Sequence, residues 1–167
     1  AFSKIINYNL NAEQQKALDN LLNLGNKFSV AVLLGITGSG KTLIYFERIK
    51  QLIKQNKQAL ILIPEIFLTT QFKNRFKLFF GYEPAIWHSK IGIGKKKKIW
   101  NSVAQNKIKI IIGARSSLFL PFKNLGLIIV DEEHDPSYKQ EESVIYNARD
   151  MAISRASIEN IPINLIT

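Results

Sequence analysis

The 167 residues include no cysteine, which excludes disulfides and thiolate metal sites from this chain. No apolar run approaches the roughly 18 residues that suggest a membrane span; the runs at 28–34 and 59–63 have the length of strands. Acidic residues are also scarce, 13 against 23 Lys and Arg, and the net charge of +10 favours a polyanionic partner without identifying it. We therefore expect a cytoplasmic protein without a membrane segment and without a zinc cluster in these residues.

The length and the 46% hydrophobic content predict one globular domain spanning residues 1–167. Ala1 stands where an initiator Met is expected and the sequence stops on a strand-like run, so we expect a domain cut from a longer protein. β-rich runs are found at 28–34, 58–63, 85–88, 107–112, 127–130 and 161–166. Helical patterns lie between most of them, at 12–23, 41–55, 68–80, 95–105 and 147–157.

This alternation predicts an α/β fold, a parallel sheet with crossover helices on both of its faces. The segments 30–34 and 127–130 are apolar without alternation, which is typical of central strands that helices cover on both sides. We accordingly expect both segments near the middle of the sheet.

Segment 35–42 reads Gly-Ile-Thr-Gly-Ser-Gly-Lys-Thr and fits the phosphate-loop pattern G-x-x-x-x-G-K-[ST], between an expected strand and an expected helix. Backbone N–H groups of such a loop surround phosphates, its Lys reaches the β- and γ-phosphates, and its Thr hydroxyl ligates Mg²⁺. The predicted nucleotide ligands are Gly35, Thr37, Gly38, Ser39, Gly40, Lys41 and Thr42. The alternative is a glycine-rich turn that binds nothing.

Segment 127–134 places acidic residues directly after a second buried strand, as in the Walker B element of the DExH type. Asp131 is expected to hold Mg²⁺ together with Thr42, and Glu132 to orient and deprotonate the attacking water. Lys41, Asp131 and Glu132 are thus the candidate catalytic residues. The alternative is a solvated acidic turn.

The base of the nucleotide is predicted to be adenine. A guanine-reading Asn-Lys-x-Asp segment is missing, because the Asn-Lys pairs at 26–27 and 106–107 lack the Asp. Upstream, segment 10–17 resembles a Q motif, in which a Gln amide reads the adenine edge; Gln14 is the candidate and Gln15 the reserve. Asn11 and Gln14 also have the spacing of a helix capping box, which is the competing interpretation.

Several further segments are specific to one family. Segment 63–71 reads Ile-Pro-Glu-Ile-Phe-Leu-Thr-Thr-Gln, 87–89 Trp-His-Ser, 112–119 Ile-Gly-Ala-Arg-Ser-Ser-Leu-Phe, 131–140 Asp-Glu-Glu-His-Asp-Pro-Ser-Tyr-Lys-Gln and 146–150 Tyr-Asn-Ala-Arg-Asp. In this order they resemble the motifs of the first motor lobe of the PriA family of superfamily 2 helicases, over nearly the whole chain. The resemblance implies a RecA-like P-loop NTPase lobe.

The resemblance also implies an ATP- and Mg²⁺-dependent 3′-to-5′ DNA helicase that acts on forked or single-stranded DNA in replication restart. Its implied protein partners are primosome proteins and single-strand-binding protein. A second motor lobe with an arginine that completes the ATP site, and a Cys-rich zinc insertion, are implied outside this chain. The isolated lobe is therefore expected to bind ATP and to hydrolyse it at a negligible rate.

Residues expected to contact DNA or to couple it to the ATP site are Arg115, His134, Tyr138, Lys139, Tyr146 and Arg149. Two alternatives come from the residues themselves: Tyr146 is a packing residue at a helix start, and Arg149 forms a local ion pair with Asp150. Arg115 at a helix entry equally fits an ion pair with a nearby acid. Val144 and Ile145 depart from the aromatic or Pro and the Arg that the family commonly has there, which leaves the coupling by this loop open.

The run Lys95–Lys98 also departs from the mixed-charge helix start of the family, and it fits either a phosphate-contacting patch or a solvated surface. Trp87 and Trp100 are expected to anchor the core. Two rival functions remain: another superfamily 2 translocase, and a non-catalytic basic module that binds nucleic acid or docks to a primosome.

Overall fold

The computed structural model describes residues 10–34, 40–132 and 148–167, and the structural statements below concern these residues. They form a six-stranded, all-parallel sheet in the order β1-β6-β5-β2-β4-β3. The strands are β1 (Ser29–Leu33), β2 (Gln58–Leu62), β3 (Ala85–Trp87), β4 (Ile110–Gly113), β5 (Leu125–Val130) and β6 (Pro162–Ile166). The predicted parallel α/β fold is confirmed.

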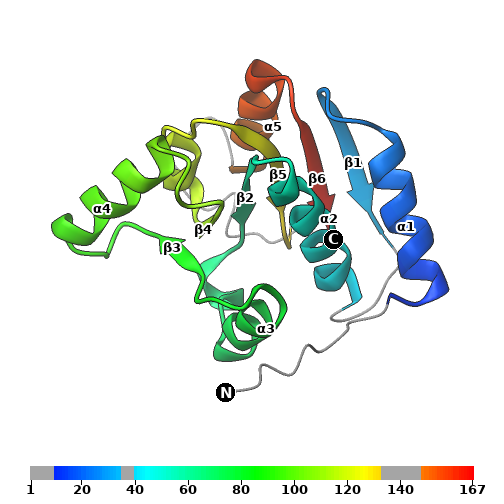
Figure 1. Cartoon of the computed structure of the whole chain (residues 1–167), viewed down its shortest axis with the longest axis horizontal. Coiled ribbons are helices and arrows are strands. Elements are labelled where there is room, and N and C mark those ends of the chain that lie inside the picture. Colours follow the sequence, from blue (N-terminus) through cyan, green and yellow to red (C-terminus); the bar gives the residue numbers. More distant parts are fainter. Residues whose placement is uncertain (1–9, 35–39, 133–147) are drawn as a thin grey trace.

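Helices cover the two faces of this sheet (Figure 1). The α-helices are α1 (Ala12–Asn23), α2 (Gly40–Lys54), α3 (Thr70–Phe80), α4 (Ile93–Ala104) and α5 (Ala148–Glu159). Two 3₁₀ turns, η1 (Glu65–Phe67) and η2 (Arg115–Phe119), follow β2 and β4. Among the described residues, no helix combines the length and the apolar character that crossing a bilayer requires.

Two apolar cores result from the alternation of side chains along the strands. In β2, Ala59 and Ile61 face the first core with α1, α2 and α3, whereas Leu60 and Leu62 face the second core with α4, η2 and α5. All of these strand side chains are fully buried. The continuous apolar runs of the sequence are therefore explained by a sheet that is covered on both faces.

Phe46 of α2 ties the first core to α3. Its ring meets those of four phenylalanines of α3 at centroid distances between 5.1 and 5.9 Å, namely Phe72, Phe76, Phe79 and Phe80. Such tilted and edge-on pairs add to the burial of apolar area. α2 also contacts β2 and β5, and it begins with the last residues of the predicted phosphate loop. The packing of Phe46 therefore helps to hold this end of α2 in place.

The expectation that segment 30–34 is a central strand is wrong. In the part of the chain that the structure describes, β1 pairs only with β6 and lies at the edge of the sheet. Its Leu33 is buried against α1 and α2, but Val30 and Val32 on the opposite face are about half exposed, because α5 contacts β5 and β6 instead. Apolar character predicted the strand but not its neighbours.

Other element boundaries also differ from the predicted ones. β4 begins at Ile110 rather than at Lys107, because the chain from Lys107 turns back on α4, where the Lys107 amide donates to the Ser102 carbonyl at 2.8 Å. α3 begins at Thr70, since the Thr69 hydroxyl caps it by accepting from the Phe72 amide at 3.1 Å. Trp100 is 43% exposed, so the expectation that it anchors the core is also wrong.

Candidate nucleotide-binding site

The carboxyl ends of the six parallel strands lie along one edge of the sheet, where ligands of such folds bind. α2 begins at this edge with Gly40, Lys41 and Thr42, directly after the predicted phosphate loop. Gly35, Thr37, Gly38 and Ser39 lie outside the described residues. The structure thus places the three last residues of the predicted loop at a helix N-terminus, where backbone N–H groups remain available to an anion.

Asp131 follows β5 and is 7% exposed. Its amide donates to the Leu62 carbonyl at 2.8 Å, which extends the pairing of β5 with β2 by one step. Its Oδ2 accepts from the Tyr45 hydroxyl at 2.7 Å and its Oδ1 from the Glu132 amide at 2.8 Å. The carboxylate is therefore held in one orientation by two donors.

Burial raises the pKa of Asp131 above its ordinary value, and the hydrogen bonds from Tyr45 and Glu132 oppose that increase. Lys41 also lowers this pKa through its charge, so the cation of the predicted phosphate loop acts on the predicted Walker B carboxylate. Such a carboxylate is ionised at neutral pH only against a desolvation cost. A cation beside it would relieve that cost.

Tyr45 is a site residue that sequence reasoning missed. It is fully buried on α2, one turn beyond Thr42, and burial together with the Asp131 carboxylate raises its pKa well above the ordinary value. The phenol therefore stays protonated and remains a hydrogen-bond donor to Asp131. The only signal in the sequence was its i,i+3 spacing from Thr42, which is equally typical of a packing residue.

A pocket of about 450 Å³ opens beside Asp131 and contains the predicted chemistry. Thr42, Asp131 and Glu132 line it, together with Arg75 of α3, which no sequence motif had singled out. Glu132 has a φ of 51°, which lies in the left-handed region that residues other than glycine rarely adopt. The turn that follows β5 thus holds Glu132, a lining residue of the pocket, in a strained backbone conformation.

Hydroxyl and carboxylate oxygens of this kind suit Mg²⁺, a hard cation that proteins bind through one or two carboxylates, waters and substrate phosphates. Thr42 and Asp131 line the same pocket. Both Asp131 oxygens accept hydrogen bonds in the structure, and a carboxylate oxygen has two lone pairs, so accepting one hydrogen bond does not prevent it from ligating a cation. The residues present therefore fit the predicted metal.

Gln14 is 8% exposed, and it makes the capping box that was the competing interpretation. Its Oε1 accepts from the Asn11 amide at 2.8 Å, and the Asn11 Oδ1 accepts from the Gln14 amide at 2.8 Å. Its Nε2 also donates to the carbonyl of Gly40 at 3.2 Å. The capping box is confirmed, and it positions the Gln14 amide against the first residue of α2.

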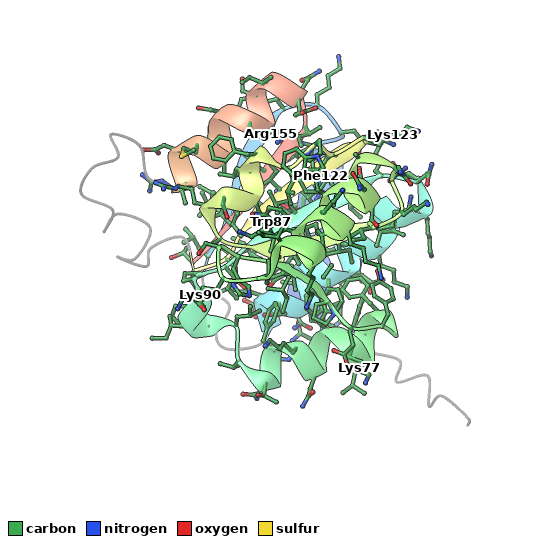
Figure 2. The ribbon with its side chains drawn as sticks, turned by 90° about the vertical axis from the view of Figure 1, so that its left-hand side faces the viewer. Lys77, Trp87, Lys90, Phe122, Lys123 and Arg155 are labelled. Atoms are coloured by element: carbon green, nitrogen blue, oxygen red, sulfur yellow. The ribbon has the colours of Figure 1, made fainter. Side chains whose placement is uncertain are left out.

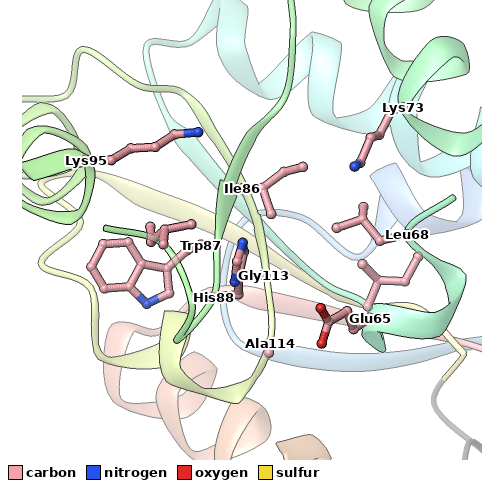
Figure 3. Close-up of a pocket in the computed structure, with 11 residues that line it drawn as sticks. Glu65, Leu68, Lys73, Ile86, Trp87, His88, Lys95, Gly113 and Ala114 are labelled. Atoms are coloured by element: carbon pink, nitrogen blue, oxygen red, sulfur yellow. The ribbon is translucent and has the colours of Figure 1, made fainter. Parts of the chain in front are cut away.

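Three of the family-specific segments, 63–71, 87–89 and 112–119, converge on a second pocket of about 310 Å³ at the carboxyl ends of β2, β3 and β4 (Figure 3). Glu65, His88 and Ala114 line it, each from a different segment, with Lys73 and Lys95 on either side. Sequence separation had hidden this proximity. These three motifs thus surround one hollow, next to the pocket of Thr42 and Asp131, and both pockets include Ile63.

Gly113 is required where β4 enters this hollow. A Cβ at Gly113 would lie 2.8 Å from the Trp87 carbonyl oxygen and 2.8 Å from the Ser117 Cβ, closer than such atoms approach in proteins. The small residue lets η2 fold back against β3. Arg115, the first residue of η2, is thereby placed at the carboxyl edge of the sheet.

The other predicted DNA contacts are mostly outside the described residues, namely His134, Tyr138, Lys139 and Tyr146. Arg149 is described, and its Nε lies 3.5 Å from the Asp150 Oδ1. The ion pair that was one of its alternatives is therefore present, and it lies at the surface, where such pairs contribute little to stability.

Comparison with known proteins gives a consistent result. A family model described as "Type III restriction enzyme, res subunit" matches residues 7–161. Proteins named replication restart protein PriA are similar in sequence: that of Rickettsia felis is 51% identical over 154 residues, covering 92% of this chain and 24% of the relative. That of Bacillus subtilis is 45% identical over 140 residues, covering 84% and 17%. The chain thus spans about a quarter or less of the length of these relatives.

Solved structures share the fold at low sequence identity. The helicase MrfA bound to DNA superposes with a TM-score of 0.66 at 18% identity, covering 99% of this chain and 25% of that one. RecG bound to a three-way DNA junction gives 0.63 at 20% identity, covering 98% and 21%. The chain therefore has the RecA-like fold of helicase motor lobes, as expected from the sequence.

Proposed function

The chain belongs to the family described as type III restriction enzyme, res subunit, and is a PriA-type member of it; on this premise we propose that it is the ATP-binding lobe of a DNA helicase. The intact protein would be a cytoplasmic 3′-to-5′ helicase that acts on forked or single-stranded DNA in replication restart, with primosome proteins and single-strand-binding protein as partners. Residues 1–167 would be one lobe of it. The pocket that Thr42, Asp131 and Glu132 share is the observation that carries the proposal.

Each of the four candidate residues Lys41, Thr42, Asp131 and Glu132 has a role in this proposal. Lys41 neutralises the β- and γ-phosphates, and the backbone N–H groups at the start of α2 receive them. Thr42 and Asp131 hold Mg²⁺, which supplies charge neutralisation when it is bound. Glu132 orients the attacking water and accepts its proton.

Tyr45 is a positioning residue in this proposal, since its hydroxyl donates to Asp131 and orients that carboxylate. Arg75 lines the pocket together with the carboxylates and would meet a phosphate oxygen. Gln14, held by Asn11 and Gly40, would read the adenine edge with its remaining donor and acceptor capacity.

The test is a titration of the chain with a fluorescent ATP analogue in Mg²⁺. We expect saturable binding that ATP displaces better than GTP does and that Lys41→Ala weakens on the order of tenfold or more, because the ammonium meets the β- and γ-phosphates. Lys54→Ala is the matched control, because Lys54 is an exposed cation in the last turn of the same helix. Equal loss in both variants, or no nucleotide binding by a chain that still binds DNA, would reject the proposal in favour of a non-catalytic basic module.

Hydrolysis by the chain alone is expected to be negligible with or without DNA. An arginine from a second lobe is worth about 10³ to 10⁵ in rate in enzymes of this kind. Phosphate release by the wild-type chain and by Glu132→Gln should therefore be indistinguishable. Substantial turnover by the wild type that Glu132→Gln abolishes would show that this lobe needs no partner.

A further inference from the structure

The positive charge of the chain is concentrated in one continuous segment. From residue 84 to residue 130 there is no Asp or Glu, whereas nine of the 23 basic residues lie there, so the rest of the chain is nearly balanced. The segment spans β3, α4, β4, η2 and β5. In Figure 1 α4 and β3 form one end of the molecule, so the charge asymmetry of the sequence is also an asymmetry in space.

The start of α4 concentrates this charge against the local rules of helix formation. Its N-cap is Gly92, which provides no side-chain hydrogen bond, and its first turn contains no acidic residue. Lys95, Lys96, Lys97 and Lys98 follow instead. Because the N-terminus of a helix already carries a partial positive charge, these lysines repel it. An anion at this place would relieve both the uncapped N–H groups and the repulsion.

The four lysines are not equivalent. The Lys96 ammonium donates to the Ser89 carbonyl at 3.0 Å and closes the loop before the helix. Lys95 lines the pocket of His88 and Gly113, while Lys97 and Lys98 are exposed. Lysines thus extend from the carboxyl edge of the sheet around the outer side of α4.

Figure 2 looks at this end of the molecule, with Lys90 and Lys123 on opposite borders and Trp87 between them. Trp100 belongs to the same surface: its ring centroid is 6.3 Å from that of Trp87, yet 43% of the residue remains exposed. An exposed aromatic ring one turn along a helix from Lys96 and Lys97 is the combination by which proteins bind both bases and phosphates.

An anionic membrane fits this helix poorly. Membrane-surface helices insert an apolar face, but Ile99 and Val103 of α4 are buried in the second core. A polyanion that needs only the outer face fits better. A nucleic acid backbone is such a ligand, since it presents a phosphate at every nucleotide and can therefore follow the lysines along the exposed side of α4.

We infer that the exposed surface of α4, which Lys95, Lys97, Lys98 and Trp100 form around the helix, binds the phosphate backbone of DNA. This surface goes beyond the proposed ATP site and the predicted contacts at Arg115 and residues 134–149. It does not depend on the nucleotide, because none of its residues lines the pocket of Thr42 and Asp131.

The experiment compares three forms of the chain: wild type, Lys95→Gln/Lys97→Gln/Lys98→Gln, and the control Lys16→Gln/Lys27→Gln/Lys54→Gln. The control removes the same charge from exposed lysines of α1, the turn after it and α2. Fluorescence anisotropy with labelled single-stranded and duplex oligonucleotides, without nucleotide, gives the affinity at several salt concentrations.

We expect the α4 variant to lose on the order of tenfold or more in affinity at about 0.1 M salt, and the control to lose about twofold or less. The slope of log affinity against log salt concentration should become less steep by about 0.9 per lost phosphate contact if duplex DNA is the ligand, and by about 0.7 if single-stranded DNA is the ligand. Trp100→Ala should weaken binding of the single strand only, if bases stack there.

Thermal unfolding provides an independent readout. Removing positive charge from the start of α4 should raise the Tm of the α4 variant, so a loss of DNA binding cannot be attributed to misfolding. Equal losses in the α4 and control variants, no loss in either, or α4-dependent binding of phosphatidylserine vesicles with unchanged DNA binding would overturn the inference. The α4 variant should bind the fluorescent ATP analogue like the wild type, which separates this result from the test of the ATP site.

Discussion

At the residue scale, burial of the Asp131 carboxylate has a cost to the stability of the fold. Its folded-state pKa is raised by burial, so the folded chain binds a proton at this group more tightly than the unfolded chain does. The corresponding contribution to stability is present below the ordinary pKa of an aspartate and is lost as the pH rises through the raised value. Near neutral pH, the hydrogen bonds from Tyr45 and Glu132 offset part of this loss.

Replacing the Asp131 carboxylate by a neutral amide should reveal how much its burial costs the stability of the fold. Asp131→Asn is expected to unfold at an equal or higher temperature than the wild type at pH 7, and the advantage should disappear as the pH falls below about 4, the ordinary pKa of an aspartate. Tyr45→Phe should destabilise the chain at pH 7 by about 1–3 kcal/mol, because it removes a donor from a buried acceptor. In the Asp131→Asn background the same change should cost less.

Thermal unfolding of the four forms between about pH 3 and pH 7 tests this pH dependence and measures the coupling between the two residues as a double-mutant cycle. Additive effects at neutral pH would show that the hydroxyl does not support the carboxylate. The sequence alone predicted Asp131 because an acidic residue after a buried strand is distinctive. It did not predict Tyr45, because a helical tyrosine indicates packing as readily as a hydrogen bond across to a strand.

At the element scale, α1 and α2 meet through one amide. Gln14 closes the cap of α1 and also donates to the Gly40 carbonyl at the start of α2, so the orientation of one helix is linked to the phosphate end of the other. From the sequence, capping and adenine recognition were competing interpretations. The geometry makes them compatible, since capping occupies only part of the hydrogen-bonding capacity of the amide.

Two variants separate these roles. Asn11→Ala should lower the free energy of unfolding by about 0.5–2 kcal/mol through loss of the cap, with little change in the preference for ATP over GTP. Gln14→Ala should lower that preference as well. Competition titrations with ATP and GTP, together with urea denaturation, provide both quantities. Equal nucleotide effects in the two variants would assign Gln14 to capping alone.

Element boundaries were predictable to within a few residues, because apolar periodicity and caps such as Thr69 are local. The neighbours of a strand are not local. Segment 30–34 has the composition of a central strand, and only the finished sheet shows that β1 lies at its edge with Val30 and Val32 half exposed.

At the scale of the whole molecule, that edge should affect solution behaviour. A strand at the edge of a sheet, with exposed valines on one face, favours pairing with another chain. We expect the isolated chain to self-associate reversibly at high concentration and Val32→Lys to reduce this, with little change in Tm because Val32 is already half exposed. Sedimentation velocity over a concentration series measures the self-association of the wild type and of Val32→Lys. Leu33→Ala, a buried change on the opposite face of the same strand, is the destabilising reference.

If Val32→Lys unfolds the chain, or if the wild type stays monomeric at the highest concentrations, this face is protected by residues of the same chain. The order of the strands was beyond sequence reasoning for a similar reason. The pattern indicated a parallel sheet, but which strand follows which across it depends on how the helices distribute between the two faces.

The placement of β1 also has a consequence for synthesis on the ribosome. β1 pairs with β6, and the Phe28 amide just before it bonds to the Asn160 side chain, 132 residues further along the chain. At about 5–20 residues per second, many seconds pass between translation of the two partners. The strand that leads into the predicted phosphate loop emerges first yet pairs with the last strand, so a nascent chain cannot complete the sheet beside the candidate nucleotide site before β6 has been made.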